Sequence, residues 1–137
     1  MKIGQHSDQT MALLQKVLDL RADREKVIAS NIANGETPGY QPSRLNFENQ
    51  LRHAIDQRSF SGQTTHQSHI PLGPQNLEQV QGVVIKERDP VELGDKNGVS
   101  LDEEMLALAK NELLYETAAQ LLKKKLSMQK YVISGGQ

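Results

Sequence analysis

One pair of histidines in this sequence has a spacing that could serve metal chemistry. His66 and His69 are three residues apart, which is a spacing found in metal sites on helices. Two ligands do not hold zinc, and the chain has no cysteine to supply a third. The flanking Gln, Ser, Thr and Pro residues also disfavour a helix. We therefore expect a solvated loop here, with no metal site and no cofactor.

Two charged runs are the other candidates for chemistry. Asp102, Glu103 and Glu104 could act as paired catalytic carboxylates, but adjacent acids on a helix point in different directions. Helix capping and the helix dipole account for all three. The run Lys123–Lys125 could contact an anionic surface, although the last turns of a solvated helix often carry such charges. Because no nucleophile elbow, phosphate-cradling glycine loop or His-Glu-x-x-His motif occurs, we predict no catalytic residue and no small-molecule substrate.

Length and composition narrow the possible classes further. The 137 residues suffice for one domain, and 16 Lys+Arg against 17 Asp+Glu leave a formal charge of −1. No basic face is available for phosphate contacts, so we expect no nucleic-acid partner. Hydrophobic residues make up 36% and aromatic residues 4%, whereas soluble domains usually contain ~45–50% apolar residues on a count that includes Gly. A large self-contained core is therefore not expected.

Glycine and proline divide the chain into three zones. Nine of the ten glycines and all five prolines lie beyond residue 34, and residues 101–134 contain neither. We therefore expect an N-terminal helix within residues 1–34, an irregular outer segment at 35–99 and a C-terminal helix within 100–137. No stretch is apolar enough to span a bilayer, and the N-terminus lacks the apolar run of a cleaved signal peptide.

The first zone has the apolar spacing of a helix. Ser7 or Asp8 is the expected N-cap, and the helix should end near Asn34 because Gly35 suits a left-handed position and Pro38 follows. The apolar residues at helical spacing are Met11, Leu14, Val17, Leu18, Val27, Ile28 and Ile32.

The last zone begins with a clear helix-start signal. Ser100 to Glu103 reads as a capping box, with acids in the first turn and lysines toward the other end. Two neighbouring registers are mostly apolar, and a stripe this broad favours contact with more than one helix. We expect the N-terminal helix to cover one of them and leave the other exposed, as in an interface. The first register is Leu101, Met105, Leu108, Glu112, Tyr115, Ala119, Leu122, Leu126, Gln129 and Ile133. The second is Ala107, Asn111, Leu114, Ala118, Leu121, Lys125, Met128 and Val132.

The middle zone predicts little regular structure. Residues 83–85 favour a short strand, and residues 45–55 favour one more helix. Phe47 and Phe60 would anchor any small core there. Residues 63–79 are poor in apolar side chains and are expected to form a loop.

The most informative stretch leads out of the first helix. Residues 37–40 predict a type II turn, in which Pro38 fixes φ at the second position and Gly39 takes the positive φ at the third. Ser30, Asn31 and Asn34 place short polar side chains over the last helical turn, where they can satisfy carbonyls or contact a neighbouring chain. The residues that form this stretch are Ala29, Ser30, Asn31, Ile32, Ala33, Asn34, Gly35, Glu36, Thr37, Pro38, Gly39 and Tyr40.

This stretch resembles the N-terminal signature of the bacterial flagellar axial proteins, which are the rod, hook and hook-associated proteins. Residues 43–47 are similar to the segment that follows the signature in proximal rod subunits, and residues 99–105 with Tyr115, Leu122 and Ser127-Met128 are similar to their C-terminal helix. The short chain, without a large inserted middle domain, also favours a proximal rod subunit over the longer distal rod and hook proteins.

The resemblance implies a structural subunit of the flagellar basal-body rod. Such subunits are exported unfolded through the flagellar type III apparatus, without a cleaved signal peptide, and they stack helically in the periplasm-spanning rod with their terminal helices forming an inner tube. The implied partners are further rod subunits, the basal-body base and the export apparatus.

Together these patterns predict a mainly α fold and a structural function. Residues 8–34 and 100–134 should pack as an antiparallel, coiled-coil-like pair, with a little β structure in between. The chain should self-assemble through apolar stripes on these helices, without catalysis. An alternative is a helical interaction module, such as a secretion adaptor or chaperone, which would need the stripes but not the signature. A small hydrolase or metal enzyme would rest on His66 and His69 alone. The stripe residues are Leu14, Leu18, Ile28, Ile32, Leu101, Met105, Leu108, Leu114, Tyr115, Ala118, Leu121, Leu122, Leu126 and Met128.

Overall fold

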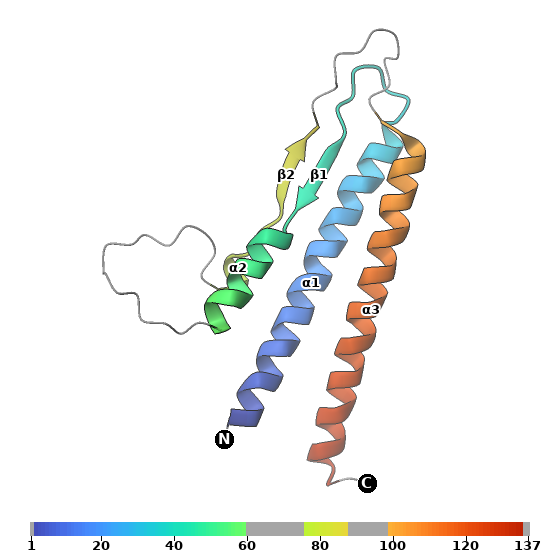
Figure 1. The fold of residues 1–137 in the computed structure, drawn as a ribbon. Helices are drawn as coiled ribbons and strands as arrows, with labels where there is room; N and C mark the ends of the chain where they lie inside the picture. Colours follow the sequence, from blue (N-terminus) through green and yellow to red (C-terminus); the bar gives the residue numbers. More distant parts are fainter. Residues whose placement is uncertain (1, 60–75, 88–98, 136–137) are drawn as a thin grey trace, which may run out of the picture.

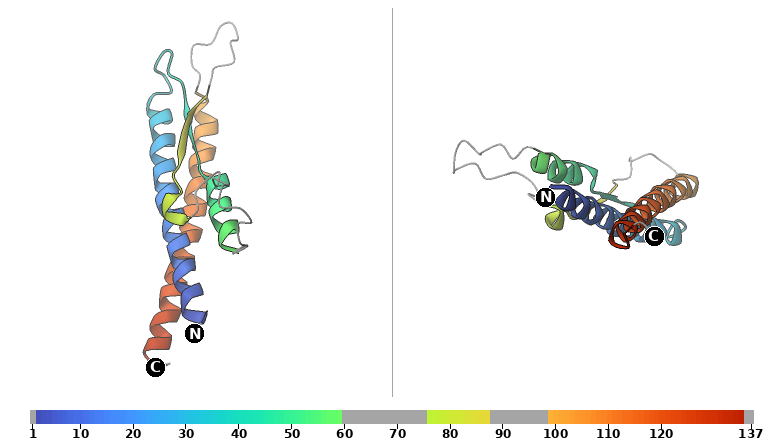
Figure 2. Two further views of the ribbon diagram at one scale, coloured as in Figure 1. Left: turned by 90° about the vertical axis from the view of Figure 1, so that its left-hand side faces the viewer. Right: turned by 90° about the horizontal axis from the view of Figure 1, so that it is seen from below.

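Two long antiparallel helices form the body of the molecule. The computed structural model describes residues 2–59, 76–87 and 99–135. Helix α1 (Lys2–Ala33) and helix α3 (Leu101–Ile133) run side by side, so that both chain termini lie at the same end (Figure 1). The molecule is elongated when it is seen from the side and narrow when it is seen along the helices (Figure 2). This architecture confirms the predicted fold class.

Helix α1 begins earlier than the sequence pattern predicts. It starts at Lys2, so the expected N-cap at Ser7 or Asp8 is wrong. The first eight residues contain no proline, and a helix can continue through Ser and Asp when nothing interrupts its backbone hydrogen bonds. The helix ends at Ala33, close to the predicted Asn34.

The exit from α1 follows the predicted turn but not the predicted helix cap. The Tyr40 N–H donates to the Thr37 carbonyl oxygen at 3.1 Å, and Gly39 has a φ of 75°, as a type II turn requires. The left-handed conformation expected at Gly35 is wrong, since only Gly39 and Gly135 have positive φ in the described part of the chain. Instead the Gly35 N–H donates to the Ile32 carbonyl oxygen at 3.2 Å, which tightens the last helical turn.

Helix α3 is confirmed over its predicted length. The Ser100 hydroxyl oxygen accepts a hydrogen bond from the Glu103 N–H, as in the first half of a capping box. At the other end the Ser134 N–H donates to the Lys130 carbonyl oxygen at 2.9 Å, and Gly135 takes a φ of 71°. The helix therefore stops where a glycine can leave the right-handed region.

The middle zone contains more regular structure than predicted. Strand β1 (Ser43–Asn46) pairs antiparallel with β2 (Val83–Lys86), which confirms the predicted strand at 83–85. The helix predicted at 45–55 is wrong at its start, because α2 spans Glu48–Ser59 and Leu45 lies in β1 opposite Val84. Strand pairing overrides local helix propensity there. A single 3₁₀ turn, Leu77–Gln79, lies within the region predicted as a loop; residues 63–75 of that region lie outside the described residues, as do Phe60, His66 and His69.

A small apolar core joins α1 to the middle zone. Its buried residues are Leu20, Leu45, Phe47, Ala54, Leu77 and Val80. Phe47 is only 2% exposed, which confirms its predicted role as an anchor. In Figure 1 the sheet and α2 lie on one side of α1 and α3 lies on the other. Helix α3 contributes nothing to this core, so other contacts must hold it to α1. No helix among the described residues is long and apolar enough to cross a membrane.

Candidate assembly interface

The contact line between α1 and α3 is polar at its centre. Helix α3 buries Glu104, Asn111 and Ala118, which are seven residues apart and so lie on one face. Glu104 is 1% exposed and Asn111 is 2% exposed. A buried polar group must be hydrogen-bonded or it costs free energy, so each of these side chains needs a defined partner.

Asn31 supplies one of these partners from the last turn of α1. Its side-chain nitrogen donates to the Glu104 carboxylate at 3.0 Å and to the Ser43 carbonyl oxygen at 2.8 Å. Its side-chain oxygen accepts from the Ser43 N–H at 2.9 Å and from the Tyr40 hydroxyl at 3.2 Å. Asn31 is completely buried, and this set of bonds satisfies its amide group. One side chain therefore joins α1, the turn, β1 and α3.

Arg44 completes the cluster from β1. Its Nη1 lies 2.6 Å from Oε1 of Glu104, and its Nε lies 3.0 Å from Oε1 of Glu87, just after β2. The buried carboxylate of Glu104 is therefore both paired with a cation and hydrogen-bonded, which is the condition for keeping a charge in the interior. We refer to Asn31, Arg44 and Glu104 as the corner cluster.

A second polar group connects α1 to the start of α2. Arg24 forms two bonds with Glu48, with Nη1 at 2.6 Å from Oε1 and Nη2 at 2.8 Å from Oε2. The same guanidinium donates to the Leu45 carbonyl oxygen and lies 4.3 Å from the centre of the Phe47 ring. Partial burial by itself raises the pKa of Glu48, but the hydrogen bond from Arg24, backbone N–H groups and the charge of Arg24 lower this pKa to about 2.

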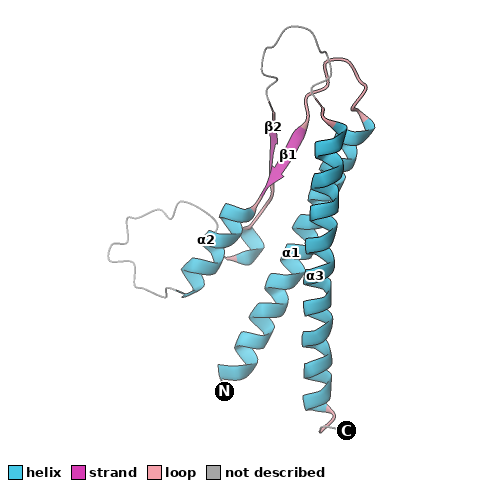
Figure 3. Ribbon diagram, turned by 45° about the vertical axis from the view of Figure 1, so that its right-hand side comes forward, coloured by secondary structure: helices cyan, strands magenta, loops and turns pink. Residues whose placement is uncertain are grey.

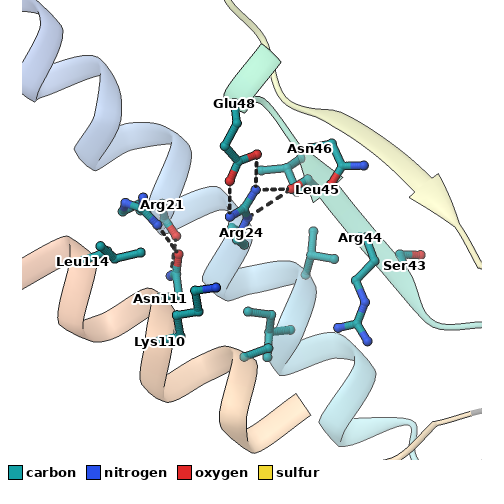
Figure 4. Close-up of a pocket in the computed structure, with 13 residues that line it drawn as sticks. Arg21, Arg24, Ser43, Arg44, Leu45, Asn46, Glu48, Lys110, Asn111 and Leu114 are labelled. Atoms are coloured by element: carbon teal, nitrogen blue, oxygen red, sulfur yellow. Dashed lines mark hydrogen bonds and ion pairs between the residues drawn. The ribbon is translucent and has the colours of Figure 1, made fainter. Parts of the chain in front are cut away.

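Asn111 of α3 forms two hydrogen bonds with Arg21 of α1. Its side-chain nitrogen donates to the Arg21 carbonyl oxygen at 2.9 Å, and Arg21 Nη1 donates back to its side-chain oxygen at 3.4 Å. Burial lowers the pKa of Arg21, and repulsion from the charge of Arg24 is a smaller cause in the same direction. Figure 4 shows these side chains in a groove of about 370 Å³, which residues of α1, β1 and α3 line together.

The groove has the features of a structural site. Glu48 lines the groove, and Glu104 contacts Arg44, which also lines it. Each of these two carboxylates is paired with an arginine, so neither is available as a general base. The described residues contain no cluster of three or more His, Cys, Asp or Glu side chains that could hold a metal ion. The polar contacts around the groove fix the positions of α1, β1, α2 and α3 relative to one another.

The signature residues gather at the corner where α1 ends. The Asn34 side chain donates to the Ser30 carbonyl oxygen at 2.8 Å, and the Ser30 and Tyr40 hydroxyls are 3.3 Å apart. The polar side chains of the signature thus satisfy carbonyls and one another. Of the remaining predicted residues, Ile32 is half-buried and Ala29, Ala33, Thr37, Pro38 and Gly39 are exposed.

The predicted stripe residues fall into three environments. Ile28 and Ala118 are buried between the helices. Those at intermediate exposure are Leu14, Leu18, Ile32, Leu108 and Leu122. Those that remain exposed are Leu101, Met105, Leu114, Tyr115, Leu121, Leu126 and Met128.

Helix α1 lies along the boundary between the two apolar registers of α3. The expectation that it covers one register and leaves the other exposed is therefore wrong. Asn111 and Ala118 of the second register are buried, and Leu108 and Leu122 of the first are half-buried. The short side chains of Ala118 and Asn111 let the helices approach on this line, and the larger leucines remain on both flanks.

Several residues that organise this region were missed by the sequence analysis. In the sequence, the helix dipole accounts for Glu104, and no pattern assigns a role to Arg24 or Arg44. The signal that could have identified Glu104 is its seven-residue spacing from Asn111 and Ala118. Leu106 and Leu113, which are 72% and 64% exposed, also belong to neither predicted register.

Comparison with known proteins places the chain among flagellar rod proteins. Residues 18–41, which include the signature, match the sequence model of the family described as "Flagella basal body rod protein". The chain is 31% identical to the flagellar basal body rod protein FlgB of Aeromonas hydrophila, over 88% of this chain and 89% of that protein. It is 32% identical to FlgB of Escherichia coli K12, over 94% and 96%, and 33% identical to FlgB of Yersinia enterocolitica, over 80% and 82%. Since these relatives are more than 30% identical to the chain over most of both lengths, the chain belongs to the flagellar basal body rod protein family.

Proposed function

We propose that this chain is a structural subunit of the flagellar rod that self-assembles through its two terminal helices and has no catalytic activity. The observation that carries the proposal is the exposure of α3. Although α3 packs against α1, Met105, Leu126 and Met128 remain 50–57% exposed. Exposed apolar surface of this extent is typical of protein–protein contacts.

The asymmetry between the helices supports the same proposal. No large apolar residue of α1 is exposed among residues 9–33, whereas exposed ones recur along α3 from Leu101 to Ile133. A helix that has satisfied its apolar face against one neighbour would not carry apolar side chains on the other sides. Helix α3 therefore fits a position between several helices. The partners we propose are further rod subunits, the basal-body base and, before assembly, the type III export apparatus.

The proposal is tested in a motile bacterium that lacks its own proximal rod subunit. The wild-type chain should enter basal bodies and restore swimming. Leu122→Asp should abolish both, because an unpaired charge at a buried helix contact costs several kcal/mol. Ala12→Asp, on the exposed side of α1, is the matched control and should swim normally.

The outcomes that count against the proposal are equally concrete. Normal swimming with Leu122→Asp would refute packing through this stripe. A wild-type chain that binds export substrates but never appears in purified basal bodies would indicate the secretion adaptor or chaperone instead.

A further inference from the structure

An apolar groove opens between the two long helices near the chain termini. Helices α1 and α3 diverge toward this end (Figure 3), and a hollow of about 350 Å³ lies between them. Its walls are Leu18 from α1 and Ala119, Leu122 and Leu126 from α3. Lys123 and Lys130 border it, and none of the described side chains that line it is acidic. The groove therefore fits an apolar ridge that carries negative charge.

The charges of α3 are separated along its length. Its acids are Asp102, Glu103, Glu104, Glu112 and Glu116. From residue 117 to the end the chain has no acid and four lysines, whereas residues 102–116 have one lysine. In the described part of the chain only Glu104 among these acids forms an ion pair, and the others are exposed. The first half of α3 thus presents free negative charge and the second half free positive charge.

The first half of α3 also carries an apolar ridge that faces away from α1. Asp102, Leu106, Ala109, Leu113 and Glu116 follow one another at alternating steps of four and three, so they lie on one helix face. All five are exposed, on the side opposite the buried Glu104. We call these five residues the acidic ridge. It has an acid at each end, with Leu106, Ala109 and Leu113 between them.

Resting on the self-assembly proposed above, we infer that the groove near the termini binds the acidic ridge of a second copy of this chain. The groove has apolar walls and lysines, and the ridge has apolar side chains and carboxylates, so the two surfaces match in polarity and are opposite in charge. The acids of the ridge lie in the first half of α3 and the lysines of the groove lie in its second half. The contact therefore displaces one copy along the helix axis relative to the next.

This contact is heterologous, because the two surfaces are different parts of the same chain. After each contact, a free ridge remains at one end of the series and a free groove remains at the other end. The contact therefore extends into an open series rather than closing. The competing arrangement is an antiparallel pair of α3 helices, in which each acidic half meets a basic half. That pair would satisfy both surfaces at once and would stop at a dimer.

Reciprocal charge reversal provides the test. The first variant, Lys123→Glu with Lys130→Glu, makes the groove acidic, and the second, Asp102→Lys with Glu116→Lys, makes the ridge basic. Self-association of each full-length variant is measured by analytical ultracentrifugation, with circular dichroism to compare helix content. There are two matched controls. Lys124→Glu changes a residue that adjoins Lys123 but does not line the groove, and Glu25→Lys changes an exposed residue of α1.

We expect each reversed variant alone to need at least about tenfold higher concentration than the wild type to associate, since like charges then meet at the contact. A mixture of the two variants should associate again at a concentration close to that of the wild type. The reversed groove then meets the reversed ridge, and the unchanged surfaces meet each other. The controls should associate like the wild type.

Three results would overturn the inference. They are unchanged association of both reversed variants, failure of the mixture to associate when each variant retains its helix content, and a wild-type series that ends at the dimer. Each leaves the rod proposal intact if the wild-type chain still enters basal bodies. Conversely, loss of basal-body entry with normal ridge-to-groove association would count against the rod function alone.

Discussion

Removing the Glu104 carboxylate should destabilise the molecule more than any other single change to the charges of α3. The carboxylate is 1% exposed, accepts from Asn31 at 3.0 Å and lies 2.6 Å from Arg44. Glu104→Ala leaves the Arg44 cation without its buried partner and removes an acceptor from the buried Asn31 amide. Both consequences favour separation of α3 from the corner where α1 ends.

The size of the effect follows from what remains after the change. Removing one member of a buried ion pair costs about 3–5 kcal/mol. The Arg44 side chain stays 29% exposed and keeps its contact with Glu87, and Asn31 keeps its bonds with Ser43. We therefore expect the low end for Glu104→Ala, about 3 kcal/mol, and about 1–2 kcal/mol for Glu104→Gln, which keeps an acceptor and the volume.

Urea unfolding followed by circular dichroism measures these differences. The neighbouring Glu103→Ala is the control, because Glu103 is exposed and its carboxylate contributes only through the helix dipole, about 0.3–1 kcal/mol. If Glu104→Ala lowers the free energy of unfolding no more than Glu103→Ala, the corner cluster does not hold α3 in place and the reasoning is refuted.

Three further predictions concern the backbone and pH. Gly39→Val should lower the amount of assembled rods in purified basal bodies more than Gly35→Ala, because Gly39 has a φ of 75° and Gly35 has no positive φ; equal effects would contradict the type II turn. Gly82→Ala should lower the midpoint of urea unfolding by an amount equivalent to about 1–3 kcal/mol, since its Cβ would lie 2.6–2.8 Å from three carbons of Leu45; an unchanged midpoint would show that Leu45 can move. Because the pKa of Glu48 falls from an ordinary 4.5 to about 2 on folding, its contribution to stability is complete above pH 4.5 and is lost as the pH falls toward 2. Glu48→Gln should flatten the measured dependence of unfolding free energy on pH in that range, and an unaltered slope would exclude this carboxylate as its source.

Local patterns in the sequence were enough to predict the long helices and the turn. The apolar spacing of residues 101–133, with Ser100 before them, specifies a helix through interactions that extend only three or four residues. The turn at Gly39 follows in the same way, because proline and glycine restrict or free φ by themselves. The resemblance to the flagellar axial proteins starts from a similarly short signature, whose residues are adjacent in the chain.

Which face of α3 meets α1 was decided only by the tertiary structure. The apolar pattern indicated the leucine registers, yet the buried line consists of Glu104, Asn111 and Ala118. A buried carboxylate is acceptable only where partners from other elements reach it, and Asn31 and Arg44 are 73 and 60 residues away in the sequence. No local pattern contains that information, since the favourable energy arises when the corner closes. The leucines that the pattern identified are consequently left on the outer flanks of α3, where other chains can reach them.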